Sequence, residues 1–156
     1  MNARPDGGVA DDHQAPDFPS EPTPRSTFTK EYWAATRERR FLVQYSAETE
    51  RFQFFPQPIS QGGTRRDLQW REVEPVGELF AYTVTHLAPG AFRGSAPYVV
   101  ATVTLDAGVR MISNLVDCPT ERIVIGMRVR GTWLPLSDGT HLLQFRPAES
   151  VAEVAS

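Results

Sequence analysis

A chain of 156 residues, 40% hydrophobic and with nine Phe and three Trp, can form one packed domain with tails, which excludes disorder throughout. Its formal net charge of −3 is concentrated at the ends. Residues 1–25 and 149–156 carry seven acidic and two basic side chains, whereas the stretch between them carries 14 basic and 12 acidic ones. That weak positive balance suits a discrete anionic ligand better than a long nucleic-acid backbone.

The number of cysteines and the length of the apolar runs indicate the cellular compartment. Cys118 is the only cysteine, so an internal disulfide is excluded. No run of about eighteen apolar residues is present, and the N-terminal residues lack the basic-then-apolar order of a secretory signal. We therefore expect a cytoplasmic protein without a transmembrane segment.

The two ends of the chain differ in composition from the rest. Residues 1–27 are rich in Pro, Asp and Gly and offer little apolar surface to bury, so we expect a disordered tail. Residues 149–156 form a short segment at the end of the chain with two acidic side chains, and we expect a flexible C-terminal tail there.

A helix is predicted within residues 28–40. Thr29 is a favoured N-cap residue, and the segment KEYWAATRERR follows it. Its spacing of large side chains indicates a helix over 30–39, with Tyr32 and Trp33 on the face that packs against the barrel or a partner.

In residues 41–67 the spacing of short strands and turns resembles that of a small metal-binding knuckle. The strand-like runs FLVQY and RFQFF are followed by a Pro-Gln-Pro turn, and two polar turns flank the FxFFPxP centre. Each turn stands where a C-x-x-C pair would stand, but the four positions are Ser46, Thr49, Ser60 and Gly63. Hydroxyls are poor zinc ligands and glycine has no side chain, so we expect no zinc and no other metal here.

Residues 68–148 read as strands. DLQWREVEP comes first, and five longer runs follow: GELFAYTVTHLA, YVVATVTLD, VRMISNLVD, RVRGTWLPL and HLLQFRP. In the first of these five, strict alternation would point Leu79 and Ala81 to one side and Phe80 and Tyr82 to the other. The count and the long loop PGAFRGSAP favour a mainly β fold with a five-stranded barrel of the OB type, and a sandwich is the alternative.

Catalytic signals are weak. No nucleophile elbow surrounds Cys118, and a lone cysteine is usually a small buried residue. His86, at the end of a predicted strand, suits either a general base or a hydrogen-bonded residue at the barrel rim. The segment GGTRR over 62–66 is not a P-loop, although its two arginines could grip a phosphate.

The order of these motifs resembles a known family. A helix with Tyr-Trp near its start precedes FLVQY, the RFQFFPQP knuckle and GELFAYTVTH. The strings PYVVATVTLDAGVR, SNLV, IGMRV and FRP then follow. This order, over residues 28–148, is similar to that of the bacterial and archaeal acyl-CoA-associated proteins that join a rubredoxin-like zinc ribbon to an OB-fold. In typical members the ribbon reads C-x-x-C twice, so the resemblance makes this chain a member without its zinc ligands.

The resemblance implies a non-catalytic accessory subunit of a thiolase-like or other CoA-ester enzyme, which helps to hold or channel the thioester. It implies no cofactor of its own, acyl-CoA as a ligand, and self-association as an open alternative. The helix would present Tyr32 and Trp33 to the partner. The residues that we would test for CoA or partner binding are Arg65, Arg66, Phe92, Arg93, Tyr98 and Arg146.

Two other classes of function stay open at this stage. OB barrels commonly bind single-stranded nucleic acid, which would require a basic groove with exposed aromatic rings. The near-neutral charge of the folded part speaks against that use. An enzyme that acts on CoA esters through His86 or Cys118 is the third hypothesis.

Overall fold

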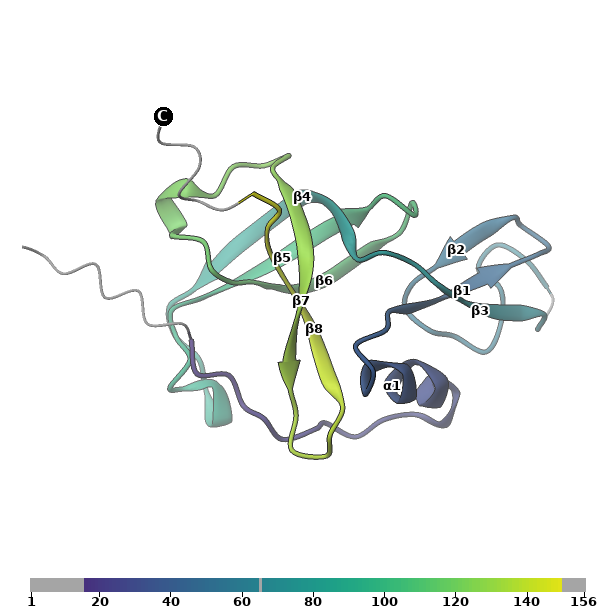
Figure 1. The fold of residues 1–156 in the computed structure, drawn as a ribbon, viewed down its shortest axis with the longest axis horizontal. Helices are drawn as coiled ribbons and strands as arrows, with labels where there is room; N and C mark the ends of the chain where they lie inside the picture. The colour runs from purple at the N-terminus through teal and green to yellow at the C-terminus, as the bar shows by residue number, and fades with distance from the viewer. Residues whose placement is uncertain (1–15, 65, 150–156) are drawn as a thin grey trace, which may run out of the picture.

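The computed structural model describes residues 16–64 and 66–149, in which a short helix and a small sheet stand beside a barrel (Figure 1). The small sheet contains β1 (Leu42–Ser46), β2 (Arg51–Gln53) and β3 (Leu68–Glu72). The barrel contains β4 (Val76–Thr85), β5 (Tyr98–Leu105), β6 (Arg110–Leu115), β7 (Arg128–Pro135) and β8 (His141–Pro147). Within the described residues, no helix has the length and apolar character needed to cross a membrane.

The helix α1 spans Lys30–Thr36 and follows a 3-10 turn, η1, at Thr27–Thr29. Arg39 adopts a positive φ of 57°, and the Arg40 N–H donates to the Ala35 carbonyl at 3.1 Å. This is the pattern of a helix that ends in a left-handed residue. The helix is therefore confirmed, but it stops three residues before the predicted end.

The small sheet, which we call the ribbon, has the strand order β2-β1-β3. The predicted strands FLVQY and RFQFF are both present, although the second shortens to Arg51–Gln53. β3 pairs with β1 from Leu42 opposite Glu72 to Ser46 opposite Leu68. Residues 68–72, which the prediction placed with the barrel, therefore make their strand hydrogen bonds with the ribbon.

The barrel is closed in the order β4-β5-β6-β8-β7, as the five-stranded OB prediction required. The pairings are antiparallel except for β6 with β8, which are parallel where Leu115 faces Phe145. Short 3-10 turns interrupt two connections, η2 at Gly90–Phe92 and η3 at Thr120–Arg122. A tight turn at 106–108 joins β5 to β6, and Gly108 has a φ of 90° there.

The strict alternation predicted along β4 is wrong after Leu79. The register with β5 shifts between Leu79 and Ala81, so a bulge absorbs Phe80. Leu79 is inside the barrel at 1% exposure and Phe80 is 47% exposed, but Ala81, which alternation placed on the side of Leu79, is exposed as well. A bulge inserts one residue into a strand and moves the following side chains to the opposite face.

A single buried cluster connects α1, the ribbon and the barrel. Tyr32, Phe41 and Val43 belong to it together with the inward side chains of the barrel, such as Val103 and Phe145. Val43, Val103 and Phe145 are fully buried, and Phe41 is 2% exposed. The ribbon is therefore fixed to the barrel by shared apolar packing.

Candidate functional site

The four positions that resemble ribbon zinc ligands converge in space. The hydroxyls of Ser46 and Ser60 share a hydrogen bond of 2.8 Å, and the Thr49 N–H donates to Ser46 Oγ at 3.3 Å. A Cβ added to Gly63 would lie 2.5 Å from Ser60 Oγ. The loop geometry expected of a ribbon is thus present, and hydroxyl and backbone contacts stand where sulfur ligands would stand.

Side-chain amides hold the ribbon loops, and the Glu48 carboxylate accepts hydrogen bonds from Thr64. Gln44 accepts from the Gln57 N–H at 2.8 Å and donates to the Gln57 carbonyl at 2.9 Å. Gln53 donates to Gln44 Oε1 at 3.1 Å and accepts from the Gln61 N–H at 2.8 Å. Gln44 and Gln53 are 5% and 4% exposed, so these bonds replace water in a buried position. Within the described residues, no group of three His, Cys, Asp or Glu side chains could hold a metal ion.

Aromatic rings pack one side of the ribbon, but they are buried to different extents. Phe54 lies 6.1 Å from the rings of both Tyr32 and Phe41, and Phe52 lies 5.2 Å from Tyr45. Phe55, by contrast, is 67% exposed. Phe55 touches only the edge of this group, with its ring centroid 5.4 Å from that of Phe54.

A cleft of about 470 Å³ lies between the ribbon and the turn that joins β5 to β6. Arg51, Phe52 and Phe54 line it from the ribbon, and Gly108 and Arg110 line it from the barrel. Two arginines and two aromatic rings in one cleft are suited to an anion with a planar group. The sequence offered no signal for Arg51 or Arg110, because the two meet only through the placement of the ribbon on the barrel.

Contacts with Phe80 and Thr104 on the outer face of the barrel orient the side chain of Arg110. Its guanidinium carbon lies 3.6 Å from the ring centroid of Phe80, and its Nε donates to Thr104 Oγ1 at 3.1 Å. The outward ring of Phe80, next to the bulge in β4, is therefore the surface on which Arg110 rests.

The arginines predicted from the sequence lie in separate parts of the molecule. Arg66 is exposed on the ribbon, Arg93 is exposed in the loop between β4 and β5, and Arg146 lies on β8 opposite Arg130. The Nε atom of Arg146 is buried and has no hydrogen-bond partner within the described residues. Arg65 lies outside the described residues.

The loop between β4 and β5 holds an aromatic group together with a segment from the N-terminus. Phe92 and Tyr98, both predicted site residues, have ring centroids 6.0 Å apart. Phe18 meets Tyr98 edge to face at 5.6 Å and is only 9% exposed. Phe18 belongs to residues 16–25, which we call the strap. The prediction of a disordered tail up to residue 27 is wrong for the strap, because the barrel loops bury part of it.

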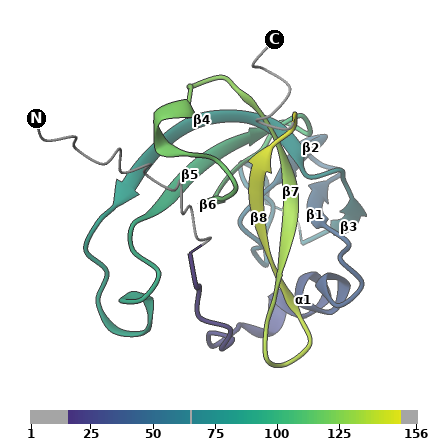
Figure 2. The same ribbon diagram turned by 60° about the vertical axis from the view of Figure 1, so that its left-hand side comes forward.

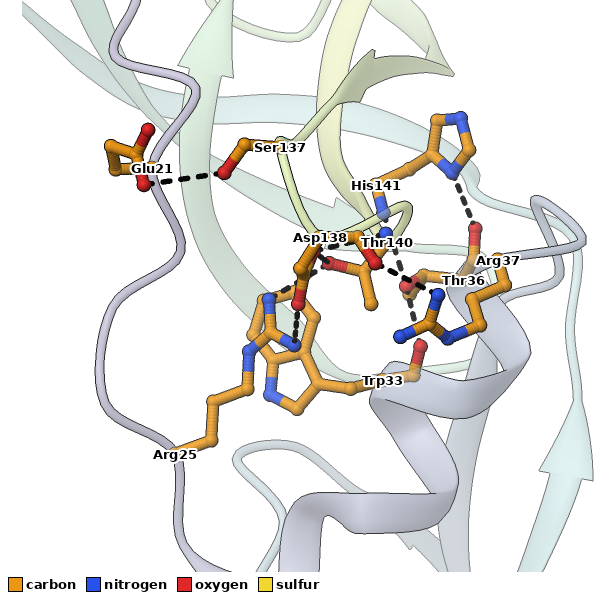
Figure 3. A network of polar contacts seen from close by, with 9 residues as sticks. All are labelled: Glu21, Arg25, Trp33, Thr36, Arg37, Ser137, Asp138, Thr140 and His141. Atoms are coloured by element: carbon orange, nitrogen blue, oxygen red, sulfur yellow. Dashed lines mark hydrogen bonds and ion pairs between the residues drawn. The ribbon is translucent and has the colours of Figure 1, made fainter.

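The helix does not present Tyr32 to a partner. Tyr32 is 6% exposed, and its ring packs against Trp33, Phe41 and Phe54, so the predicted outward role is wrong for this residue. Burial also raises the pKa of the Tyr32 hydroxyl well above its usual range. Trp33 is half-buried, and the guanidinium of Arg25 lies over its ring (Figure 3).

The candidate catalytic residues show no activation. His86 is exposed at the end of β4. Burial raises the pKa of the Cys118 thiol, although nearby Arg122 opposes that shift. A nucleophilic cysteine needs the opposite shift, so this thiol is suited to a structural position.

These features define a two-module protein: a ribbon with hydroxyl and backbone groups at the four ligand positions, and an OB barrel, which share one core. Residues 70–134 match the model of the family described as the C-terminal OB-fold domain of ChsH2. A "DUF35 domain-containing scaffold protein" of Methanocaldococcus jannaschii is 30% identical over 126 residues, which cover 76% of this chain and 89% of that protein. The chain belongs to the DUF35 family of scaffold proteins.

Two further relatives carry names of enzyme subunits. A solved chain described as "Ltp2-ChsH2(DUF35) aldolase" superimposes with a TM-score of 0.74 at 31% identity, covering 82% of this chain and 100% of that chain. A probable enoyl-CoA hydratase alpha subunit of Thermomonospora curvata is 33% identical over 129 residues. Those residues are 81% of this chain but only 40% of that subunit, so this chain spans less than half of its length.

Proposed function

We propose that this chain is a non-catalytic accessory subunit that binds a thiolase-like or other CoA-ester enzyme and helps to hold its thioester. The observation that carries the proposal is the likeness, over the whole of that chain, to the DUF35 chain of an aldolase assembly. The name of the hydratase alpha subunit supports the link to CoA esters. The raised pKa of Cys118 and the exposure of His86 support a subunit without chemistry of its own.

The ribbon–barrel cleft is the place proposed for the anionic end of the CoA ester. Guanidinium groups bind phosphate oxygens in a planar fork, and aromatic rings stack on a base. Arg51 and Arg110 supply the guanidinium groups, and Phe52 and Phe54 supply the aromatic rings. Arg66, Arg93 and Arg146 remain proposed contacts, either with the CoA ester or with the enzyme.

The test uses the full chain together with the thiolase-fold and hydratase enzymes of its own organism. We expect one of them to co-elute with it at a fixed ratio in size-exclusion chromatography with light scattering. Its turnover of a CoA ester should then depend on the chain. Absence of any such complex would overturn the proposal. Light scattering of the chain alone tests self-association separately.

Variants separate the parts of the proposal. R51Q/R110Q should raise the KM for the CoA ester several-fold and leave the complex intact, whereas R39Q, in the exposed turn after α1, should change neither. The pair H86A/C118S should leave turnover unchanged. A loss of turnover in that pair, with the complex retained, would assign chemistry to this chain instead.

Single-stranded nucleic acid remains the alternative ligand, and the structure does not favour it. OB barrels bind oligonucleotides with the loops between their first and second strands and between their fourth and fifth strands. Here those loops follow β4 and β7, and the strap lies against both (Figure 2).

A further inference from the structure

The strap crosses the loop end of the barrel without forming a helix or a strand. It runs from the β4–β5 loop to the tip of the β7–β8 hairpin and then enters η1 and α1 (Figures 1 and 2). Because these are the loops with which OB barrels hold ligands, the strap occupies the surface that this fold uses for recognition.

The first anchor of the strap is aromatic. Phe18 is 9% exposed and packs edge to face on Tyr98. Beside it, the hydroxyl of Ser95, which is 2% exposed, donates to the Asp17 carbonyl. The β4–β5 loop and the start of β5 therefore provide an aromatic contact and a buried hydrogen-bond donor for this part of the strap.

The second anchor is charged (Figure 3). One terminal nitrogen of Arg25 donates to Asp138 Oδ2 at 2.9 Å, and the other donates to Thr140 Oγ1 at 2.8 Å. The guanidinium also lies 3.9 Å from the ring centroid of Trp33. Thr140 is 1% exposed and itself donates to Asp138 Oδ1 at 2.6 Å, so the carboxylate is held in place for the arginine.

Along the strap, every third side chain is partly buried. Pro16, Pro19, Pro22 and Arg25 are half-buried, whereas every other strap residue except Phe18 is exposed. A polyproline II helix has three residues per turn, and aromatic-lined grooves recognise proline-rich segments in that form. A backbone bond fixes the middle of the strap, where the N–H of Ser137 donates to the carbonyl of Ser20 at 2.8 Å.

We propose that the loop end of the barrel is a recognition site for a proline-rich extended peptide that carries an aromatic residue and, seven positions later, an arginine. The strap fills this site as an intramolecular ligand. Because a tethered ligand acts at a millimolar effective concentration, a second peptide binds only when the strap is weakened or displaced. This inference does not depend on the identity of the partner enzyme.

The test uses the full chain and a fluorescein-labelled peptide of residues 16–27, PDFPSEPTPRST. We expect F18A/R25A, which removes both anchors of the strap, to bind the peptide at least tenfold more tightly than the unmodified chain. A control peptide with Ala at the positions of Phe18 and Arg25 should bind that variant at least tenfold more weakly. Equal binding of the two peptides, or no saturable binding to the folded variant, would overturn the proposal.

A second measurement does not depend on that variant remaining intact. Hydrogen exchange at the Ser137 amide reports strap release directly, because that N–H is bonded to the strap. In R25Q, which weakens the arginine anchor and leaves the hydrogen bonds between Asp138 and Thr140 in place, the amide should exchange faster, and added peptide should slow it again. An unchanged exchange rate would overturn the proposal. Binding of a single-stranded oligonucleotide to F18A/R25A in place of the peptide would assign the site to nucleic acid and equally overturn it.

Discussion

At the scale of single residues, Ser46 and Ser60 share a hydrogen bond where two zinc-bound sulfurs would stand in a ribbon. Thr49 and Gly63 complete the group through a backbone N–H and a close approach. Family resemblance identified these four positions. It did not reveal Gln44 and Gln53, because a glutamine in a strand carries no local sign that its amide will hold a distant loop.

The convergence predicts that cysteines can restore the metal site. S46C/T49C/S60C/G63C should bind about one zinc per chain, because four thiolates can surround the ion at about 2.3 Å once the Glu48 carboxylate turns aside. Metal analysis and the absorption of the Co²⁺-substituted form measure this. The unmodified chain is the control and should contain no stoichiometric zinc. Zinc in that control would contradict the prediction that the ribbon binds no metal.

The ion pair at the β5–β6 turn predicts a pH dependence. Arg128 donates to both carboxylate oxygens of Asp106, at 2.8 and 2.7 Å, and these hydrogen bonds hold the pKa of that carboxyl below its usual value of 3.8. Because the folded-state pKa is lowered, the stabilisation is complete above the unfolded pKa and is lost as the pH falls through the folded one. The Tm measured from pH 7 to pH 2 should therefore fall less steeply below about pH 4 in D106N. Identical slopes for both proteins would contradict the assignment.

At the scale of elements, the ribbon is held by its loops as much as by its strands. β1 carries Gln44 and β2 carries Gln53, and both amides bind backbone groups of residues 57–61. Strand periodicity predicted β1 and β2 themselves. The loop contacts follow from how the chain returns after the Pro-Gln-Pro turn, which periodicity does not describe.

Gln44→Ala should lower the free energy of unfolding by about 1–3 kcal/mol, because it leaves buried donors and acceptors of the loop without partners. Chemical denaturation measures the change. Gln57→Ala is the matched control: its side chain is exposed and its backbone makes the bonds, so the change should stay within about 0.5 kcal/mol. Equal losses in the two variants would contradict the amide clamp.

β4 and β5 come together closely at Gly77. A Cβ there would lie 2.2 Å from the Thr104 carbonyl oxygen, which belongs to the backbone and cannot turn away. Gly77→Ala should therefore destabilise the barrel by about 1–3 kcal/mol, as overpacking does. Gly94→Ala is the control, since nothing lies within 4 Å of its added Cβ. Thermal melts of the two variants measure the difference in stability. A Gly77→Ala protein as stable as the Gly94→Ala control would refute the close approach.

At the scale of the whole molecule, Phe41 connects the two modules. It is 2% exposed and belongs to the cluster that contains Tyr32 from the helix and Val103 from the barrel. Ribbon and barrel should therefore unfold as one cooperative unit. The shared cleft, with Arg51 on one side and Arg110 on the other, exists only because this packing fixes their relative position.

Phe41→Ala should cost about 3–5 kcal/mol and lower the cooperativity of unfolding. Hydrogen exchange across a denaturant series measures this: amides of β1 and β5 should lose protection together in the unmodified chain and separately in the variant. Phe55→Ala, at 67% exposure, should preserve the joint transition. Separate transitions already present in the unmodified chain would contradict a shared core.

The sequence by itself determined the helix, the ribbon strands and the five-strand barrel, because turn residues and apolar periodicity are local properties of the chain. The tertiary structure alone decided three other matters. The bulge between Leu79 and Ala81 shifted the register of β4, Tyr32 packed against the core instead of facing a partner, and the strap came to lie on the barrel loops. Each of these outcomes depends on contacts between residues far apart in the chain, and no local pattern encodes such contacts.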